Sequence, residues 1–196
     1  MLVIGITGNF GTGKTTVSQM LAELGAVTIN ADDLGHELLQ PDTQTHKEIV
    51  AAFGRSILKP NGEVDRNKLA KLVFDDNAAL ARLNQITHPK IYEIVKHRIE
   101  EYRHTGAKVV VMEAALLIEA GWKPLVDQLW VTIAPEATIV SRLQRSRGLT
   151  EEQVLARLHT QMPQEKKAKQ ADVVIDTDCS LDALRAKISE LWQNLP

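Results

Sequence analysis

A nine-residue stretch near the start of the chain, GNFGTGKTT (residues 8–16), constrains the fold more than any other feature. It follows the apolar run LVIGIT (residues 2–7) and precedes apolar residues at helical spacing. Gly8, four further residues and then Gly13-Lys-Thr match the P-loop pattern. The stretch therefore predicts a strand, a phosphate-binding loop and a helix, in that order.

Each part of this stretch suits the binding of phosphate. Glycines allow the backbone to turn its N–H groups around an anion, and the N-terminus of the following helix adds a partial positive charge. Lys14 is expected to reach the β- and γ-phosphates, and Thr15 is expected to ligate Mg²⁺. The alternative is a glycine-rich turn that binds nothing. Because the pattern and its place in the chain agree, the sequence predicts a bound nucleoside triphosphate.

Four more runs of β-branched and apolar residues indicate strands. They are AVTIN (26–30), KVVVM (108–112), QLWVTIA (128–134) and DVVID (172–176). Because they are mostly apolar throughout rather than alternating, they are expected to be buried on both faces. Helical patterns separate them, which predicts an α/β fold with a five-stranded parallel sheet between layers of helices. This is the three-layer core of a P-loop NTPase.

Two long segments without strands are expected to be helical insertions. Residues 41–105 show helical patterns at about 44–53, after Asp65, at about 77–87, and from Pro89 onward, and they are expected to form one wall of a cleft.

The second insertion, residues 141–170, has the pattern of a helical lid. It contains TEEQ, a capping-box pattern that starts at Thr150, followed by the basic stretch QEKKAKQ. The final segment, LDALRAKISELWQNL, has the spacing of an amphipathic helix that closes the sheet. The chain is expected to be one domain whose core is made of residues 1–40, 106–140 and 171–196.

Composition argues against several classes of function. The formal net charge is -2, so there is no overall positive field to attract nucleic acid or an anionic membrane. Cys179 is the only cysteine, which excludes an intrachain disulfide and a cysteine-based zinc site and favours a reducing compartment. MLVIGIT resembles neither a signal peptide nor a membrane span. A cytoplasmic protein is expected, without nucleic acid, a membrane or an obligate protein partner.

Three classes of nucleotide-dependent protein are compared. A GTPase switch needs DxxG and NKxD elements; DDLG (32–35) imitates the first, but NKLA (67–70) lacks the aspartate that reads guanine. A motor ATPase or helicase needs a strand that ends in aspartate, whereas KVVVME ends in Glu113. A small-molecule kinase needs a wall for the acceptor and a lid that excludes water, which the two insertions offer. The kinase is the favoured class.

The acceptor side is expected where the second strand ends. Ligands bind beyond the carboxyl ends of parallel strands, and TINADD places Asp32 and Asp33 there. Asp32 is expected to orient an acceptor hydroxyl and take its proton, because phosphoryl transfer depends mainly on positioning. From position alone, capping of the next helix is an equal alternative. The division expected is Asp33 as the cap and Asp32 as the base.

Nearly the whole chain now resembles the dephospho-coenzyme A kinase family, whose members phosphorylate the ribose 3′-hydroxyl of dephospho-CoA at the end of coenzyme A synthesis. Several motifs occur in order, and together they are more specific than any one. The segments that carry the resemblance are GITGNFGTGKTT, ADDLGHELL, FGRSILKPNGEVDRNKLAKLVF, LNQITHPKI, ALLIE, RLQRSRGLTEEQVLARLHTQMP and ADVVID.

The resemblance implies that ATP is the co-substrate, that Asp32 is the general base, and that the His88-Pro89 helix and the ALLIE segment help to form the dephospho-CoA pocket. Two positions depart from the family. Asn30 replaces the first acid of the usual DAD, and Ala115 replaces the proline of the usual PLL, which leaves the local turn geometry open. The alternatives are another small-molecule or nucleotide kinase of this architecture and a nucleotide-dependent regulatory switch.

Other charged residues have two possible roles each. Arg142 and Arg145 can share a helix face and reach the transferring phosphoryl group from the lid, or form a solvated basic face; the resemblance favours Arg142. Arg66 is expected to meet substrate phosphates, with a surface salt bridge equally open. Glu113 is expected to hold Mg²⁺ through water or to cap a helix. His88 has the pattern of a capping or packing residue, and the resemblance suggests substrate binding instead.

Together these arguments assign three sets of residues. The expected catalytic residues are Lys14, Asp32 and Arg142. Those expected to bind ATP are Gly8, Gly11, Thr12, Gly13, Lys14, Thr15, Thr16, Arg142 and Arg145. Those expected to bind the acceptor are Asp32, Arg66, His88, Pro89, Leu116, Leu117 and Glu119. Mg²⁺ is expected on Thr15 directly and on Glu113 through water.

Overall fold

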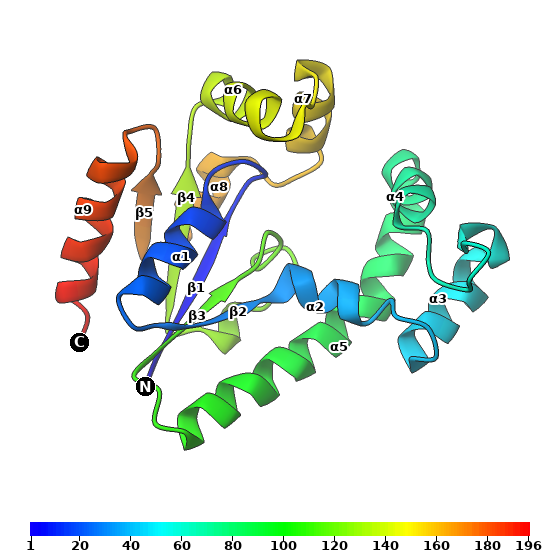
Figure 1. Ribbon diagram of the computed structural model, residues 1–196, viewed down its shortest axis with the longest axis horizontal. Helices are drawn as coiled ribbons and strands as arrows, with labels where there is room; N and C mark the ends of the chain where they lie inside the picture. The colour runs from blue at the N-terminus through cyan, green and yellow to red at the C-terminus, as the bar shows by residue number, and fades with distance from the viewer. The chain divides into compact units, whose positions relative to one another are not determined.

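The computed structural model describes the backbone of residues 1–196 and their side chains except those of residues 74, 75 and 77. Over that backbone the strands form one five-stranded parallel sheet in the order β2-β3-β1-β4-β5 (Figure 1). The predicted α/β fold with a five-stranded parallel sheet is confirmed. The strands are β1 (Leu2–Gly8), β2 (Val27–Asn30), β3 (Val109–Glu113), β4 (Gln128–Ile133) and β5 (Val173–Asp176).

The register of the sheet brings the ends of the central strands together. Ile6 of β1 pairs with Glu113 of β3, and Glu113 in turn pairs with Asn30 of β2. On the other side, Gly8 pairs with Thr132 of β4. Because all the strands are parallel, their carboxyl ends form one edge, where ligands of such sheets bind.

The chain divides into two compact units, one made of residues 1–30 and 98–196 and the other of residues 31–97. The first unit contains the whole sheet. The insertion and lid boundaries stated above, 41–105 and 141–170, stay predictions. No described helix combines the length and the apolar character that crossing a membrane requires.

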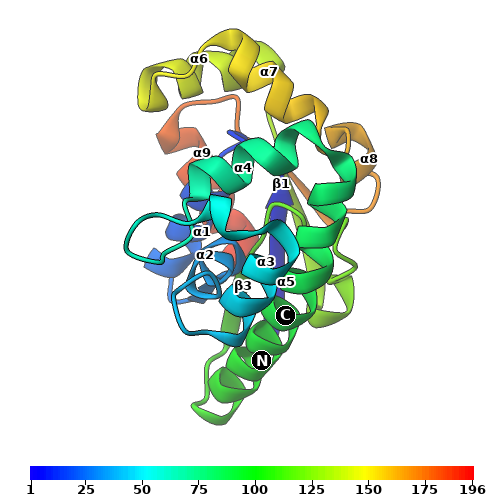
Figure 2. The same ribbon diagram turned by 90° about the vertical axis from the view of Figure 1, so that its right-hand side faces the viewer.

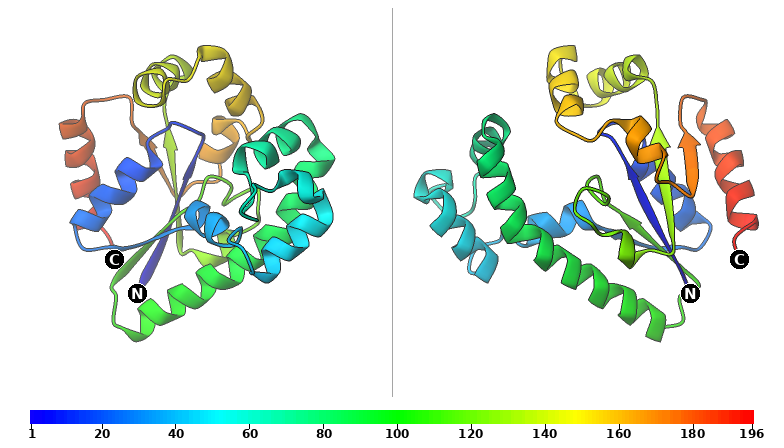
Figure 3. Two further views of the ribbon diagram at one scale, coloured as in Figure 1. Left: turned by 45° about the vertical axis from the view of Figure 1, so that its right-hand side comes forward. Right: turned by 180° about the vertical axis from the view of Figure 1, so that it is seen from behind.

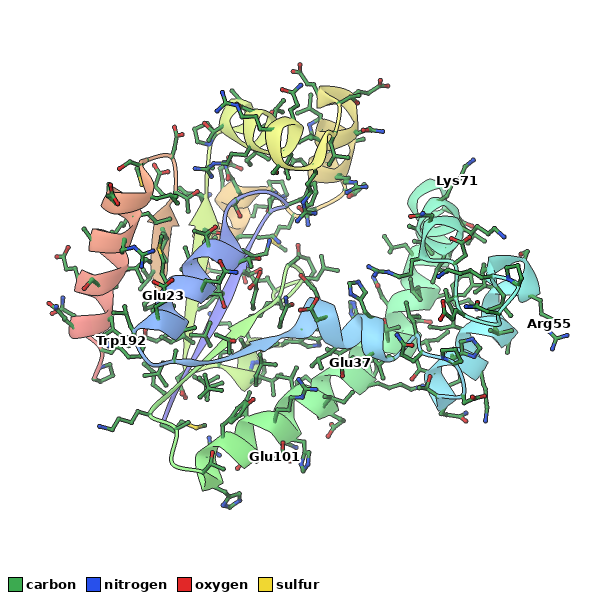
Figure 4. The ribbon with its side chains drawn as sticks, in the orientation of Figure 1. Glu23, Glu37, Arg55, Lys71, Glu101 and Trp192 are labelled. Carbon is green, nitrogen blue, oxygen red and sulfur yellow. The ribbon has the colours of Figure 1, made fainter. Side chains whose placement is uncertain are left out.

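Helices cover both faces of the sheet in the first unit. α1 (Lys14–Glu23) and α9 (Leu181–Gln193) contact each other, and Figure 3 shows α8 (Gln164–Ala168) on the face turned away from α1. Figure 4 labels Glu23 on α1 and Trp192 on α9, which lie near each other. The core between these helices and the sheet contains Ile4, Ile6, Val17, Leu21, Trp130, Leu184 and Ile188.

The segment predicted to be a lid lies beyond the carboxyl end of β4 (Figure 1), and its first two helices lie side by side (Figure 2). It contains α6 (Glu136–Arg147) and α7 (Glu151–His159), which pack on a small apolar cluster with Phe10. The predicted capping box is confirmed, because the Thr150 side chain accepts from the Gln153 N–H and the Gln153 side chain accepts from the Thr150 N–H. A short helix, η2 (Lys123–Leu125), precedes β4.

The second unit is helical. Its elements are α2 (Ala31–Glu37), α3 (Gln44–Phe53), η1 (Arg55–Ile57), α4 (Arg66–Asp75) and most of α5 (Asn77–His104). Side chains cap two of these helices, since Thr43 accepts from the His46 N–H and Asp65 accepts from two N–H groups of α4. A separate apolar cluster holds the unit together and includes Ile49, Ile57, Val64 and Leu69.

One expectation for this region is wrong. The sequence predicts one helix to about residue 87 and another that opens at Pro89, but α5 continues through Pro89. A proline in a helix removes one backbone hydrogen bond, so local pattern favours a break. Here Pro89 is exposed, while Ile91 and Val95 on the same helix are buried, with exposed fractions of 6% and 0%. Burial of the apolar face therefore outweighs the local cost of the proline.

Candidate active site

The loop after β1 has the backbone conformation of a phosphate-binding nest. Gly8, Gly11 and Gly13 have φ angles of 152°, 80° and 87°, which other residues rarely adopt. Gly8 is also tightly enclosed, because an added Cβ atom would lie 2.3 Å from Thr132 Oγ1 and 2.5 Å from the Thr132 carbonyl oxygen. The loop therefore keeps its shape only with glycine at this position.

Lys14 lies at the start of α1 and is folded back over the loop. Its exposed fraction is 9%, and its Nζ donates to the carbonyl oxygens of Gly8 at 3.0 Å and Asn9 at 3.2 Å. These two contacts hold the ammonium group beside the N–H groups of the nest. Positive charge and the N-terminus of α1 thus occur together, as anion binding requires.

Thr15 and Glu113 form the part of the site that suits a divalent cation. Thr15 Oγ1 donates to Glu113 Oε1 at 2.6 Å, and Glu113 is 5% exposed at the end of β3. A hydroxyl and a carboxylate are oxygen ligands of the kind Mg²⁺ prefers. Among the described side chains, no group of three or more His, Cys, Asp or Glu could hold a metal alone. A magnesium ion here would therefore take further ligands from bound phosphates.

A network of hydroxyl groups fixes the loop to β4 and to the segment after β5. Thr12 Oγ1 and Thr132 Oγ1 are 2.7 Å apart, and Thr177 Oγ1 donates to the Thr12 carbonyl oxygen at 2.9 Å. Arg142 of α6 donates to Thr177 Oγ1 at 3.0 Å and to its carbonyl oxygen. Thr132 and Thr177 were not among the residues expected at this site; their place at the ends of neighbouring strands is the signal that could have found them.

The segment from α6 to Gln161 also contacts the loop through Phe10. The Phe10 N–H donates to Gln161 Oε1 at 2.8 Å, and the guanidinium groups of Arg147 and Arg157 lie 5.1 Å and 5.2 Å from the centre of the Phe10 ring. These distances are within the range of cation–π attraction. Arg145, which was expected to bind ATP, lies on the exposed side of α6. Phe10, Arg157 and Gln161 were not among the expected site residues.

The turn after β3, residues 114–121, carries three of the expected acceptor residues. Leu116 is half-buried, whereas Leu117 is fully buried and packs against Gly5. The Glu119 carboxylate accepts from the Met162 N–H at 3.4 Å. Leu117 thus faces the core of the first unit, and Leu116 and Glu119 are its more accessible neighbours.

In the second unit, Asp32 and Asp33 are exposed in the first turn of α2. The expectation that Asp33 is the N-cap is wrong, because α2 begins at Ala31. Carboxylates in the first turn instead favour the helix through its dipole. Asp33 Oδ1 lies 3.9 Å from His36 Nδ1, and the Arg66 guanidinium hydrogen-bonds to His36 Nε2.

Arg66, His88 and Pro89 also belong to the second unit. Arg66 begins α4 and lines a cavity of about 550 Å³ together with Lys59 and Asp65. His88 is half-buried in α5, and burial lowers the pKa of its imidazole, which favours the neutral form. Two cations, Arg66 and Lys59, and one carboxylate, Asp65, line the Arg66 cavity, and Lys59 also pairs with Glu63 at 2.9 Å.

Comparison with known proteins agrees with the geometry of the loop and its partners. The family model described as dephospho-CoA kinase matches residues 2–183. A dephospho-CoA kinase of Geobacter sulfurreducens is 44% identical over 192 residues, which cover 98% of each chain. The chain belongs to the dephospho-CoA kinase family. The reaction of this family is the ATP-dependent phosphorylation of dephospho-CoA in coenzyme A biosynthesis, so ATP and dephospho-CoA are the substrates.

Solved structures agree with this family and with the predicted P-loop kinase fold. A crystal structure of a Thermus thermophilus protein has a TM-score of 0.83 at 33% identity and covers 100% of this chain and 98% of its own. A dephospho-CoA kinase from Campylobacter jejuni has a TM-score of 0.71 at 26% identity, with 97% and 95% covered.

Proposed function

We propose that the chain transfers the γ-phosphoryl group of ATP, with Mg²⁺, to the ribose 3′-hydroxyl of dephospho-CoA. The observation that carries the donor side of this proposal is the joining of the glycine nest and Lys14 to the Thr15–Glu113 pair at one edge of the sheet. The acceptor side is supported by the family match over residues 2–183. A nest and an ammonium group suit phosphates, and a hydroxyl beside a carboxylate suits the cation that accompanies them.

On the donor side, the turn at Gly8 and the N–H groups of residues 11–16 are proposed to hold the phosphates, with Lys14 on the β- and γ-phosphates. Thr15 would hold Mg²⁺ directly and Glu113 would hold it through water. When bound, the ion neutralises charge on the β- and γ-phosphate oxygens. Arg142 and Arg145 are proposed as lid residues that approach the nucleotide. For Arg142, this requires exchange of at least one of its two bonds to Thr177.

On the acceptor side, Asp32 is proposed as the general base. It follows the end of β2 by two residues, is exposed, and matches the acid that the family uses. The 3′-oxygen would bond to the γ-phosphorus while the bond from that phosphorus to the β–γ bridging oxygen breaks. The electron pair leaves with ADP and the hydroxyl proton passes to Asp32. Residues proposed to bind the rest of the acceptor are Arg66, His88, Pro89 and Leu116. Leu117, which is fully buried, and Glu119, which pairs with Lys167, are proposed to shape the turn that carries Leu116.

The direct test measures ADP release with ATP, Mg²⁺ and dephospho-CoA, beside nucleoside monophosphates, shikimate and gluconate as alternative acceptors. Turnover with dephospho-CoA and a new phosphomonoester on the ribose 3′-oxygen in ³¹P NMR would support the proposal. Turnover with another acceptor but not with dephospho-CoA would favour the other small-molecule kinases. Tight nucleotide binding without acceptor-dependent turnover would favour a switch.

Asp32→Asn tests the base. It keeps the size of the side chain but removes the proton acceptor, so kcat should fall by about 10²- to 10⁴-fold while ATP affinity stays within about twofold. Asp33→Asn is the matched control, since Asp33 is an exposed neighbour in the same helical turn, and it should keep near-normal kcat. A near-normal kcat for Asp32→Asn would remove Asp32 as the base.

The cellular setting is also a proposal. We infer a cytoplasmic enzyme that acts on its two substrates without nucleic acid, a membrane or an obligate protein partner. The single cysteine and the near-neutral net charge support this. Fractionation of cells and size measurement of the purified chain would test it.

A further inference from the structure

Lys167 on α8 is completely buried, with an exposed fraction of 0%. Its Nζ donates to the Ala115 carbonyl oxygen at 2.9 Å and lies 2.9 Å from Glu119 Oε1. Both partners belong to the turn of residues 114–121 that follows β3. The neighbours Lys166 and Lys169 in the same basic stretch are exposed, so only the central lysine is turned into the protein.

Burial of an ammonium group costs free energy, because the group loses its hydration. A buried ion pair often contributes no more to stability than apolar side chains of the same volume. The lysine can, however, fix the positions of its partners, because its three N–H donors need acceptors in defined places. Its two contacts fix a backbone carbonyl and a carboxylate four residues apart, which sets the shape of the turn between them.

The same turn is tied to the donor site and to the end of the lid. Thr7 Oγ1 of β1 donates to the Ala115 carbonyl oxygen at 3.2 Å, so that oxygen accepts from both Thr7 and Lys167. Glu113, immediately before the turn, accepts from Thr15 of the phosphate loop. At the other end, Glu119 accepts from Met162, which lies between α7 and α8.

We propose that Lys167 is a positioning residue for the acceptor. By holding Ala115 and Glu119, it fixes the turn against which dephospho-CoA binds and joins that turn to the segment that returns from the lid. This inference rests on the acceptor role of the turn given under the proposed function. The Glu119 carboxylate then acts mainly through Lys167, and the acceptor meets the side of the turn that carries the half-buried Leu116.

Two variants separate positioning from stability. Lys167→Met removes the ammonium group and leaves the Glu119 carboxylate without this partner. Adding Glu119→Gln removes the remaining charge, so the double variant should recover most of the stability lost by the single variant. Lys166→Met is the control, because Lys166 is an exposed lysine on the same helix.

The expected result is a split between the two substrates. In both Lys167 variants the KM for dephospho-CoA should rise about tenfold, while ATP affinity, measured by displacement of a fluorescent nucleotide, stays within about twofold. Lys166→Met should match the unchanged chain. A double variant of normal Tm with an unchanged KM would overturn the inference, and so would an equal loss of ATP affinity.

If the Lys167 variants do not fold, Glu119→Gln alone gives the answer, because it keeps the volume of a partly exposed side chain. It should raise the KM for dephospho-CoA about threefold at normal ATP affinity, and an unchanged KM would overturn the inference. The unchanged chain is assayed in parallel. If the unchanged chain shows no turnover with dephospho-CoA, the proposed function is wrong. If it turns over and the Lys167 variants keep the same KM, only the inference about Lys167 is wrong.

Discussion

Gly8 shows how one residue can be required for both fold and site. It ends β1, has a φ angle of 152°, and approaches Thr132 so closely that no side chain fits. The same close approach places the loop beside the Thr12–Thr132 hydroxyl pair. The P-loop pattern predicts a glycine here, but only the sheet register reveals Thr132 as its neighbour, 124 residues away in the sequence.

Gly8→Ala should therefore damage stability and nucleotide binding together. The added Cβ would overlap two Thr132 atoms, and overpacking of this kind lowers the free energy of unfolding by about 1–3 kcal/mol. Gly106→Ala is the matched control, since Gly106 also has a positive φ, 81°, but nothing lies within 4 Å of its added Cβ. Urea unfolding with and without ATP would measure both effects. Equal losses for the two variants would mean that backbone strain, and not the contact with Thr132, is responsible.

At the scale of elements, the phosphate loop and the helices α6 and α7 are joined by side chains that come from distant parts of the chain. Phe10 packs with the apolar cluster of α6 and α7 and lies under Arg147 and Arg157. The sequence predicts α6, α7 and the capping box because these depend on neighbouring residues. It does not predict the Phe10 contacts, because nothing in the residues around Arg147 or Arg157 indicates which aromatic ring each arginine will contact.

Phe10→Leu tests how far this contact holds the lid segment. Leucine keeps an apolar side chain, and the Phe10 N–H bond to Gln161 is made by the backbone and remains. Two exposed cation–π contacts, at about 0.5–1 kcal/mol each, are lost, so amide exchange in α7 should quicken by about five- to thirtyfold. Phe53→Leu in the second unit is the control and should leave α7 exchange unchanged. Unchanged exchange in Phe10→Leu would show that the apolar cluster alone holds the lid.

At the scale of the whole molecule, the features that neighbouring residues determine were predictable, and those that depend on distant contacts were not. The five strands were predictable because each is a short run rich in β-branched and apolar residues, and parallel pairing follows from the helices between them. The expected base, Asp32, and the phosphate loop were placed by strand ends and by family motifs, and the role of Asp32 stays a prediction. The burial of Lys167 was not predictable, because the stretch around it has the composition of a solvated charged surface. Its burial depends on contact with a turn 52 residues earlier in the chain.

The continuity of α5 is the other feature that local pattern missed, and it has consequences for the whole chain. The helix runs through Pro89, and the boundary between the two units, between residues 97 and 98, falls within it. One helix therefore contributes residues to both units. Its apolar face is buried at Ile91, Val95 and Ile99. Pro89 is thus an exposed helix-breaking residue inside α5. Replacing it should change the stability of the chain and its activity in opposite directions.

Pro89→Ala should raise Tm and lower activity. Alanine restores the missing N–H and favours a helix interior by about 3 kcal/mol over proline, less about 1 kcal/mol for the freer unfolded chain. The net gain of about 2 kcal/mol corresponds to about 4–8 °C in Tm for a chain of this size. If the proline shapes α5 for the acceptor, kcat/KM for dephospho-CoA should fall while ATP affinity is kept. Ala81→Gly, an exposed position past the first turn of the same helix, should lower Tm instead, which calibrates the response of α5. A higher Tm with unchanged kcat/KM would leave Pro89 without a role in acceptor binding.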